Sequence, residues 1–158
     1  MFPATLLLLC VFGGADDRQD AAKNELAKLE GTWYGVGGEE GWRVSTPEEA
    51  KMDEEEFIFK GDLLIIRRHG TVAGELKMSV DPSKDPKEMD LIFTKGDNAG
   101  KKCLAIYTIA GGQLKICTET KLRPSDGGPR PNVFSTQKRQ EKSKRPGLLL
   151  FILERQKK

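Results

Sequence analysis

The sequence predicts an all-β fold, an antiparallel up-and-down β-barrel of about eight strands with one or two short helices. In short runs, apolar residues recur at every second position, as in strands with one buried face. Turn residues interrupt these runs about every eight to twelve residues, and strands do not alternate with long helices. Finally, Gly31-Thr32-Trp33 opens the first strand pattern and Arg155 ends the last. The two ends of the chain can therefore meet and close the sheet.

The first 15 residues predict a cleaved secretory signal. They carry no charge and contain the apolar run 6–12, much shorter than the roughly 20 residues that a membrane span needs. Gly13-Gly14-Ala15 precedes two acids and favours cleavage after Ala15. The residues before the apolar run lack the Lys or Arg that is usual in a signal peptide. Two alternatives are therefore left open: the protein starts at another residue, or the segment is a poor signal. We expect an exported protein (periplasmic, cell-envelope or extracellular), with residues 16–29 as a short helix or linker and residues 30–156 as one barrel domain.

Two short helices are expected before the main run of strands. Asp20 can cap a helix over Asp20–Leu29, in which Ala22, Leu26 and Leu29 form the apolar stripe and Gly31 ends it. The first strand then covers 31–36 and ends at Gly37-Gly38. The second helix starts at Thr46-Pro47-Glu48-Glu49, which forms a capping box with a proline at the first helical position. We expect this helix to end at about Asp53 and to lie at the rim of the barrel.

The remaining strands follow from alternation and turn chemistry. Gly61-Asp62 and His69-Gly70 are expected turns, and the prolines of 81–86 make that segment a loop, because proline cannot donate to a sheet. A Pro- and Gly-rich stretch over 122–131 leads to Asn132–Ser135 as a candidate ninth strand. The other expected strands are 57–59, 63–66, 72–80 (with Val72, Gly74, Leu76, Met78 and Val80 on one face), 89–93, 104–109, 114–118 and 148–153.

Cys103 and Cys117 flank an expected hairpin, so whether they pair depends on the register of its strands. A two-residue Gly111-Gly112 turn pairs Tyr107 with Ile116 and Ile106 with Cys117, which places the two sulfur atoms on opposite faces. A one-residue bulge would place them on the same face and permit a disulfide. We favour two unpaired, mostly buried thiols.

The pattern at the two chain ends is typical of one superfamily of barrels. A glycine, a tryptophan two residues later and a cation on the last strand match Gly31, Trp33 and Arg155. An arginine lying over the indole face would stabilise the closure by roughly 0.5–2 kcal/mol. In this the chain resembles the lipocalin and fatty-acid-binding superfamily. The resemblance implies that these residues close the base of the barrel as structural residues, and that a ligand would enter at the other end.

A closer resemblance covers most of the chain after residue 15. It rests on the segments 29–33, 59–63, 81–91, 105–107, 112–117, 130–134 and 153–155. These are similar to an uncharacterised lipocalin-like (calycin-like) domain found in many copies in planctomycete bacteria. That family usually has Gly-Ile-Tyr where this chain has Ala105-Ile106-Tyr107, and a shorter loop before the last strand. The resemblance implies a fold and no reaction, because the family has no assigned activity.

The composition and the absence of known motifs argue against nucleic-acid binding, catalysis and metal binding. The net charge is +2, which argues against a nucleic-acid partner. The only histidine, His69, is expected to be a solvated turn residue. Asp53–Glu56 lacks a calcium-binding spacing, and its consecutive acids point to opposite faces of a strand. Loop shaping explains Asp81, Asp85 and Asp90. We therefore expect no enzyme, no cofactor and no metal site.

Two functions of different class are left open. The first is binding of a small apolar or amphipathic ligand without catalysis, with Tyr107, Arg123 and Arg130 as candidate residues at the barrel mouth. The second is a cell-envelope interaction or structural module with a filled barrel. Its protein partner is unknown, and it would dock through the acidic run 48–56, the basic run 138–145 or Lys157-Lys158. The interior decides between them. An apolar cavity of several hundred Å³ favours the ligand, whereas a barrel plugged by Phe57, Phe59, Phe93 and Phe151 favours the module.

Overall fold

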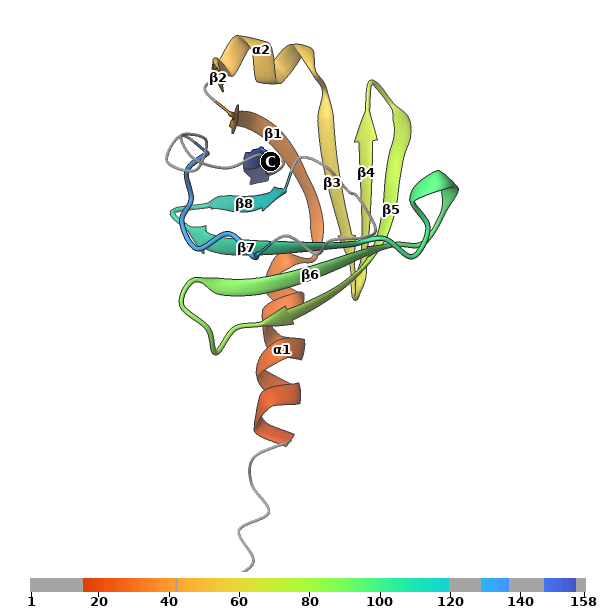
Figure 1. Cartoon of the computed structure of the whole chain (residues 1–158), viewed down its shortest axis with the longest axis vertical. Coiled ribbons are helices and arrows are strands. Elements are labelled where there is room, and N and C mark those ends of the chain that lie inside the picture. The colour runs from red at the N-terminus through yellow and green to blue at the C-terminus, as the bar shows by residue number, and fades with distance from the viewer. Residues whose placement is uncertain (1–15, 42, 120–128, 137–146, 156–158) are drawn as a thin grey trace, which may run out of the picture.

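The computed structural model describes residues 16–41, 43–119, 129–136 and 147–155. Eight antiparallel strands form a closed barrel in which each strand pairs with its neighbour in sequence and β1 pairs with both β3 and β9 (Figure 1). The predicted all-β, lipocalin-like barrel is confirmed. Its elements are α1 (Asp16–Leu29), β1 (Gly31–Glu40), β2 (Arg43–Ser45), α2 (Pro47–Met52), β3 (Glu55–Lys60), β4 (Leu63–Arg68), β5 (Thr71–Asp81), β6 (Lys87–Phe93), η1 (Gly96–Asn98), β7 (Lys102–Ala110), β8 (Gln113–Glu119) and β9 (Leu148–Arg155).

The barrel closes through the two residues that the sequence singled out. Trp33 of β1 lies opposite Arg155 of β9, and the guanidinium carbon is 4.6 Å from the centre of the indole ring. Arg155 also donates to the carbonyls of Lys28 and Glu30, and Trp33 Nε1 donates to Leu29 O at 2.8 Å. The closing pair, Trp33 and Arg155, therefore ties both ends of the barrel sheet to the end of α1. Gly31 serves here through its φ of +112°, because a Cβ at this position would meet no atom within 4 Å.

The first strand is longer than predicted. Gly37 and Gly38 do not end β1, which continues to Glu40 and pairs with β9 and with the short β2. The pairing with β9 shifts between Gly35 and Gly37, an irregularity of the β-bulge kind. Gly38 allows a close approach of the two strands, because a Cβ there would lie 2.6 Å from Leu150 O. The glycines thus serve strand pairing rather than a turn.

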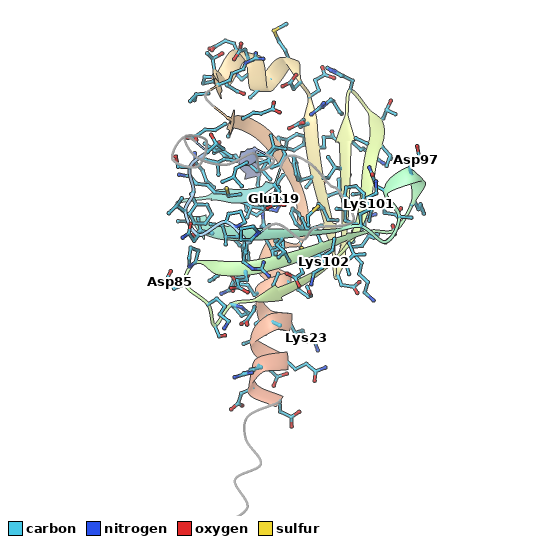
Figure 2. All side chains as sticks on the ribbon, viewed as in Figure 1. Lys23, Asp85, Asp97, Lys101, Lys102 and Glu119 are labelled. Atoms are coloured by element: carbon cyan, nitrogen blue, oxygen red, sulfur yellow. The ribbon has the colours of Figure 1, made fainter. Side chains whose placement is uncertain are left out.

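Helix α1 closes the base of the barrel with its last turns. It begins at Asp16 among the described residues, so Asp20 lies inside the helix and the predicted cap at Asp20 is wrong. Leu29 is buried and Leu26 partly buried against the barrel interior, as the apolar stripe predicts. Glu25 is also buried, at 3% exposure, and accepts hydrogen bonds from Lys28 and from Lys87 of β6. The first turns extend away from the barrel (Figure 1), and Lys23 projects into solvent there (Figure 2).

Helix α2 lies over the opposite, open end of the barrel (Figure 1). The hydroxyl of Thr46 accepts from the backbone of Glu49, whose carboxylate accepts from the backbone of Thr46. The predicted capping box is confirmed, with Pro47 in the first turn and Asp53 as the C-cap. Ala50 is the buried residue of α2, so the helix rests on the rim through a small side chain.

Side chains from every strand of the barrel fill its interior. Phe57, Phe59 and Phe93 are at most 9% exposed and belong to one contiguous apolar cluster, against which Phe151 packs with its ring centre 5.1 Å from that of Phe57. Val72, which was expected on this inward face, is 54% exposed, because the β4–β5 pairing is irregular after Ile66. The other buried members are Leu29, Trp33, Leu64, Leu76, Met78, Met89, Leu91, Cys103, Ala105, Tyr107, Leu114, Ile116 and Leu153.

The β7–β8 hairpin has the predicted register. Tyr107 pairs with Ile116 and Ile106 with Cys117 around the turn at Gly111 and Gly112. Cys103 therefore belongs to the interior cluster, whereas Cys117 belongs to a second apolar cluster on the outside of the barrel. Both cysteines are buried and lie on opposite faces of the sheet, so they do not pair with each other, as expected.

The described segment 129–136 lies against this outer cluster and is not a strand, so the expected strand over Asn132–Ser135 is absent from it. Phe134 packs on the outer cluster of Ile106, Cys117, Leu148 and Leu150. At the far end of the segment, the Thr136 hydroxyl donates to Gly41 O at 2.6 Å, and its backbone N–H donates to the Glu39 carboxylate. The segment thereby covers a part of the sheet that would otherwise expose apolar side chains.

Truncating the tryptophan of the closing pair should destabilise the protein strongly. Trp33→Ala removes a large buried ring, its hydrogen bond to Leu29 and the contact with Arg155. We expect a loss of about 3–5 kcal/mol in the free energy of unfolding, measured in urea. Trp33→Phe keeps an aromatic ring and should lose less. Unchanged stability of Trp33→Ala would contradict a role in closing the barrel.

The ion pairs of Glu25 should make the docking of α1 sensitive to acid. Burial alone would raise the pKa of Glu25, but the hydrogen bonds from Lys87 and Lys28 outweigh it and hold this pKa below 4.5. A lowered pKa contributes stability above the unfolded-state value, and the contribution disappears as the pH falls through the folded-state value. We therefore expect the stability gap between wild type and Glu25→Gln to shrink below about pH 4.5 in urea titrations. A gap that is constant between pH 6 and pH 3 would contradict this.

Candidate functional site

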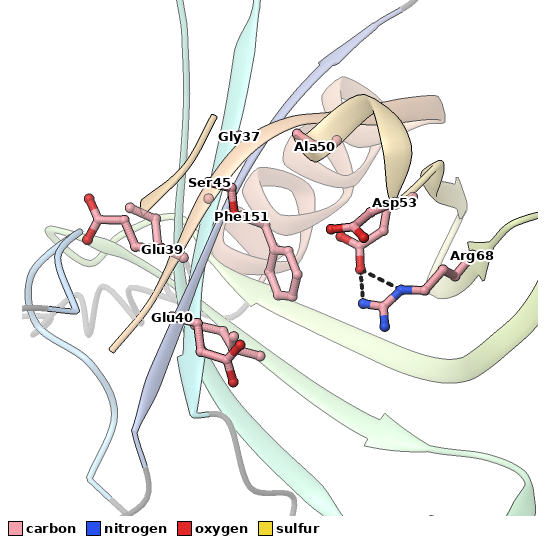
Figure 3. Close-up of a pocket in the computed structure, with 13 residues that line it drawn as sticks. Gly37, Glu39, Glu40, Ser45, Ala50, Asp53, Arg68 and Phe151 are labelled. Atoms are coloured by element: carbon pink, nitrogen blue, oxygen red, sulfur yellow. Dashed lines mark hydrogen bonds and ion pairs between the residues drawn. The ribbon is translucent and has the colours of Figure 1, made fainter. Parts of the chain in front are cut away.

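A small pocket opens at the end of the barrel that α2 borders. Its volume is about 110 Å³, and its walls come from β1, β2, α2, β3, β4 and β9 (Figure 3). Gly35, Gly37 and Gly38 form one wall, where missing side chains leave room. The other lining residues are Glu39, Glu40, Ser45, Ala50, Asp53, Glu55, Arg68, Leu149, Leu150 and Phe151.

An arginine and three of the four lining acids, Glu40, Asp53 and Glu55, define the charge of this pocket. Glu55 and Arg68 lie opposite each other on β3 and β4, and Arg68 Nε and Nη2 both donate to Glu55 Oε1. The hydrogen bonds to Glu55 raise the pKa of Arg68, and the carboxylates of Asp53 and Glu40 add to the rise. The guanidinium is thus permanently charged, yet it balances only one of the three acids.

The floor of the pocket is aromatic. Phe151 projects from β9 into the middle of the pocket, between Glu40 on one side and Arg68 on the other (Figure 3). It packs on Phe57, which closes the barrel interior beneath it. A ligand at this end would therefore meet a ring face and carboxylates at the surface rather than a deep apolar channel.

The residues at the rim of the pocket are held by hydrogen bonds that do not involve Phe151. Arg43 of β2 donates to Glu49 of α2 at 2.9 Å, and the capping box holds the start of the helix. Glu39 points away from the pocket (Figure 3) and is held by Thr136 on the outside of the barrel. Glu40 carries no such bond among the described residues and remains exposed. It is the carboxylate of this site most available to a ligand.

The predicted mouth residues are not at this mouth. Tyr107 is fully buried in the interior at the opposite end, beneath α1. Arg130 lies outside the barrel, where its guanidinium donates to the carbonyls of Met89 and Ala105 and contacts the carboxylates of Glu88 and Asp90. Both placements correct the prediction, and Asp90 anchors this arginine rather than shaping a loop. Arg123 lies outside the described residues, as do the expected signal 1–15, the basic run 138–145 and Lys157-Lys158.

Sequence reasoning missed Glu40, Glu55 and Arg68. Side chains two residues apart on a strand point to the same face of the sheet. Glu55 therefore shares the inward face of Phe57, and Arg68 shares that of Ile66. Glu40 could not be found in this way, because the shift in pairing between Gly35 and Gly37 reverses the alternation of β1. The predicted structural residues Gly31, Trp33 and Arg155 do come together, at the base.

His69, Asp81 and Cys103 do not line this pocket. His69 lies in the predicted turn, 59% exposed, with Nδ1 3.7 Å from Glu54. Asp81 accepts from Ser83 and shapes its loop, as expected. Burial, with a contribution from Glu119, raises the pKa of Cys103 to about 11, so this thiol is a poor nucleophile at neutral pH. Within the described ranges, His, Cys, Asp and Glu do not gather into a group that could hold a metal ion.

Comparison with known proteins found no matching family model, no matching curated protein and no matching solved structure. The resemblance to the planctomycete lipocalin-like domain therefore stays a prediction. In the part of the chain that the structure describes, none of the helices is both long and apolar enough to span a membrane.

Two neighbouring glycines of the pocket wall should differ sharply in their tolerance of alanine. A Cβ on Gly38 would lie 2.6 Å from Leu150 O, whereas one on Gly37 would make ordinary contacts of 3.8 Å with Ile152. We expect Gly38→Ala to destabilise the protein by about 1–3 kcal/mol, because β1 and β9 must separate. Gly37→Ala should stay within about 1 kcal/mol of wild type. Equal urea midpoints for the two variants would show that the strands do not meet as described.

Proposed function

We propose that the protein is a non-catalytic binding module that holds the cationic end of a small amphipathic ligand at the open end of its barrel. The observation that supports this most is the Phe151 ring flanked by Glu40, Asp53 and Glu55, with Arg68 as the single cation among them. An organic cation would gain from both features, since ring faces and carboxylates each attract positive charge.

The size of the pocket limits which part of the ligand it can hold. A volume of about 110 Å³ is well below the roughly 300–1,000 Å³ of sites that enclose a drug-sized molecule. It can take a head group such as an ammonium or guanidinium. The tail would then lie on the rim, where Val44 of β2 is 55% exposed and Met52 of α2 is 75% exposed. The ligand class is thus amphipathic rather than wholly apolar.

We also propose that the chain is exported and belongs to the planctomycete lipocalin-like family. The uncharged apolar run followed by small residues supports export, and the shared segments support the family. A binding role without a reaction is supported by the described His, Cys, Asp and Glu side chains, which do not gather into a group that could hold a metal ion.

The test compares two probes of one chain length, hexylammonium and hexanoate. We expect saturable binding of hexylammonium by calorimetry and no binding of hexanoate at this end. Amide chemical shifts should change at Phe151 and Arg68. Glu40→Gln should weaken hexylammonium binding about tenfold, because it removes a carboxylate that no described residue pairs with.

Glu48→Gln is the matched control, because Glu48 is an exposed acid of α2 that does not line the pocket. It should bind hexylammonium as wild type does. Equal weakening in both variants would indicate a diffuse effect of net charge rather than a site. Absence of saturable hexylammonium binding to the wild-type protein would overturn the proposed function.

The filled interior favours a second candidate, a cell-envelope interaction module. Phe57, Phe59, Phe93 and Phe151 occupy the barrel as that hypothesis requires. The acids of α2 and the start of β3 would then dock a basic partner protein. Absence of hexylammonium binding, together with a partner that crosslinks at the α2 rim, would favour this module over the ligand-binding role.

A further inference from the structure

At the base of the barrel, a buried tyrosine has an unused hydroxyl. Tyr107 is 0% exposed, and its Oη lies near the Glu25 carboxylate without a hydrogen bond of acceptable geometry to any described residue. Burial and the neighbouring Glu25 carboxylate raise its pKa, so the hydroxyl keeps its proton and remains a donor. A buried donor without an acceptor costs about 1–3 kcal/mol, so its retention here calls for a physical reason.

The lysine beside it is already bound to a carboxylate. Lys87 Nζ donates to Glu25 of α1 and lies 6.0 Å from the centre of the Tyr107 ring. The Lys87 side chain is 35% exposed, whereas that of Glu25 is 4% exposed. The Lys87 ammonium, which solvent can reach, therefore binds the buried Glu25 carboxylate, and the Tyr107 hydroxyl lies near the same carboxylate.

Helix α1 presents that carboxylate together with apolar side chains. Glu25 and Leu29 are one helical turn apart and both buried, and Leu26 packs on the interior beside them. A carboxylate followed by aliphatic groups is the chemistry of an anionic amphipath. The helix thus occupies the base of the barrel as such a molecule would.

The buried contacts of α1 with the barrel lie in its last turns, at Glu25 and Leu29, whereas the exposed Arg18 only borders β5 near Asp81. Residues 16–21 are exposed, and Ala22 is only partly buried. A helix of 14 residues is marginal in water without such packing. The hydrogen bonds of Trp33 and Arg155 fix the backbone only from Lys28 to Glu30, so the turns before Lys28 can unwind without opening the closing pair.

We propose that the α1 end of the barrel is a second binding site, for an anionic amphipath with a carboxylate head, and that Glu25 and Leu26 occupy it as an internal ligand. An incoming carboxylate would accept from Lys87 in place of Glu25 and also from Tyr107, whose hydroxyl the internal ligand leaves unused. Its tail would take the positions of Leu26 and neighbouring side chains of the helix.

The other charges at this end permit such an exchange. Asp81 is the further anion near Tyr107, and its carboxylate is engaged by the backbone and hydroxyl of Ser83. Lys28, which also donates to Glu25, is released with it and remains exposed. The incoming carboxylate therefore keeps Lys87 as a donor and exchanges the exposed Lys28 for the buried hydroxyl of Tyr107.

Octanoate and octanol are suitable probes of the full-length protein, followed by calorimetry and amide chemical shifts. We expect saturable binding of octanoate but not of octanol, with the shifts of residues 16–26 moving toward unwound values. Lys87→Met should weaken octanoate binding at least tenfold and Tyr107→Phe severalfold. Glu25→Gln should tighten it at least tenfold, because the competing carboxylate is gone. A purely structural role for Glu25 predicts no tightening.

Lys77→Met is the matched control, because Lys77 is an exposed barrel lysine paired with Asp62. It should leave octanoate binding unchanged. If Lys87→Met fails to fold, Tyr107→Phe and Glu25→Gln decide the question. The proposal is overturned if neither wild type nor Glu25→Gln binds octanoate, if Glu25→Gln does not bind it more tightly, or if the shifts occur at Phe151 instead of α1.

Discussion

The pairing of β1 with both β3 and β9 is the constraint on which the rest of the structure depends. One strand must satisfy two neighbours while it bends around the barrel, so it carries four glycines and a shift in pairing. The closing pair then ties this strand, the last strand and the end of α1 together at one point. Without this junction the sheet would be open, with two exposed edges and an unprotected core.

Closure of so small a barrel also determines where binding can occur. Aromatic and aliphatic side chains fill the interior from Leu29 at one end to Phe151 at the other. Polar groups are therefore excluded from the middle and gather at the two ends. The open end has an excess of carboxylates, and the base has Lys87 and Tyr107 beneath α1. The two proposed sites differ in charge because different strand ends, with different sequences, supply them.

Local sequence rules predicted the local features well. The register of the β7–β8 hairpin followed from a two-glycine turn, and the capping box followed from Thr46 and Glu49. Those rules did not predict most of the contacts between segments that are far apart in the sequence. Arg130 reaches β6 across forty positions of sequence, and no periodicity in its own loop indicates that direction. The burial of Glu25 could not be predicted from the helix alone, because charged residues are mostly exposed and only its partner Lys87, 62 positions away, explains it.

The shift in pairing between Gly35 and Gly37 has a consequence for how this chain can vary. The shift determines which side chains of the rest of β1 face the interior and which face outward. As a result, Glu39 reaches Thr136 outside the barrel, while the next residue, Glu40, faces the pocket. Loss or gain of one residue at this place would exchange the two acids. The pocket would lose its unpaired carboxylate, and the outer segment would lose its anchor in the same step. Two surfaces on opposite sides of the wall are thus coupled by the length of one strand.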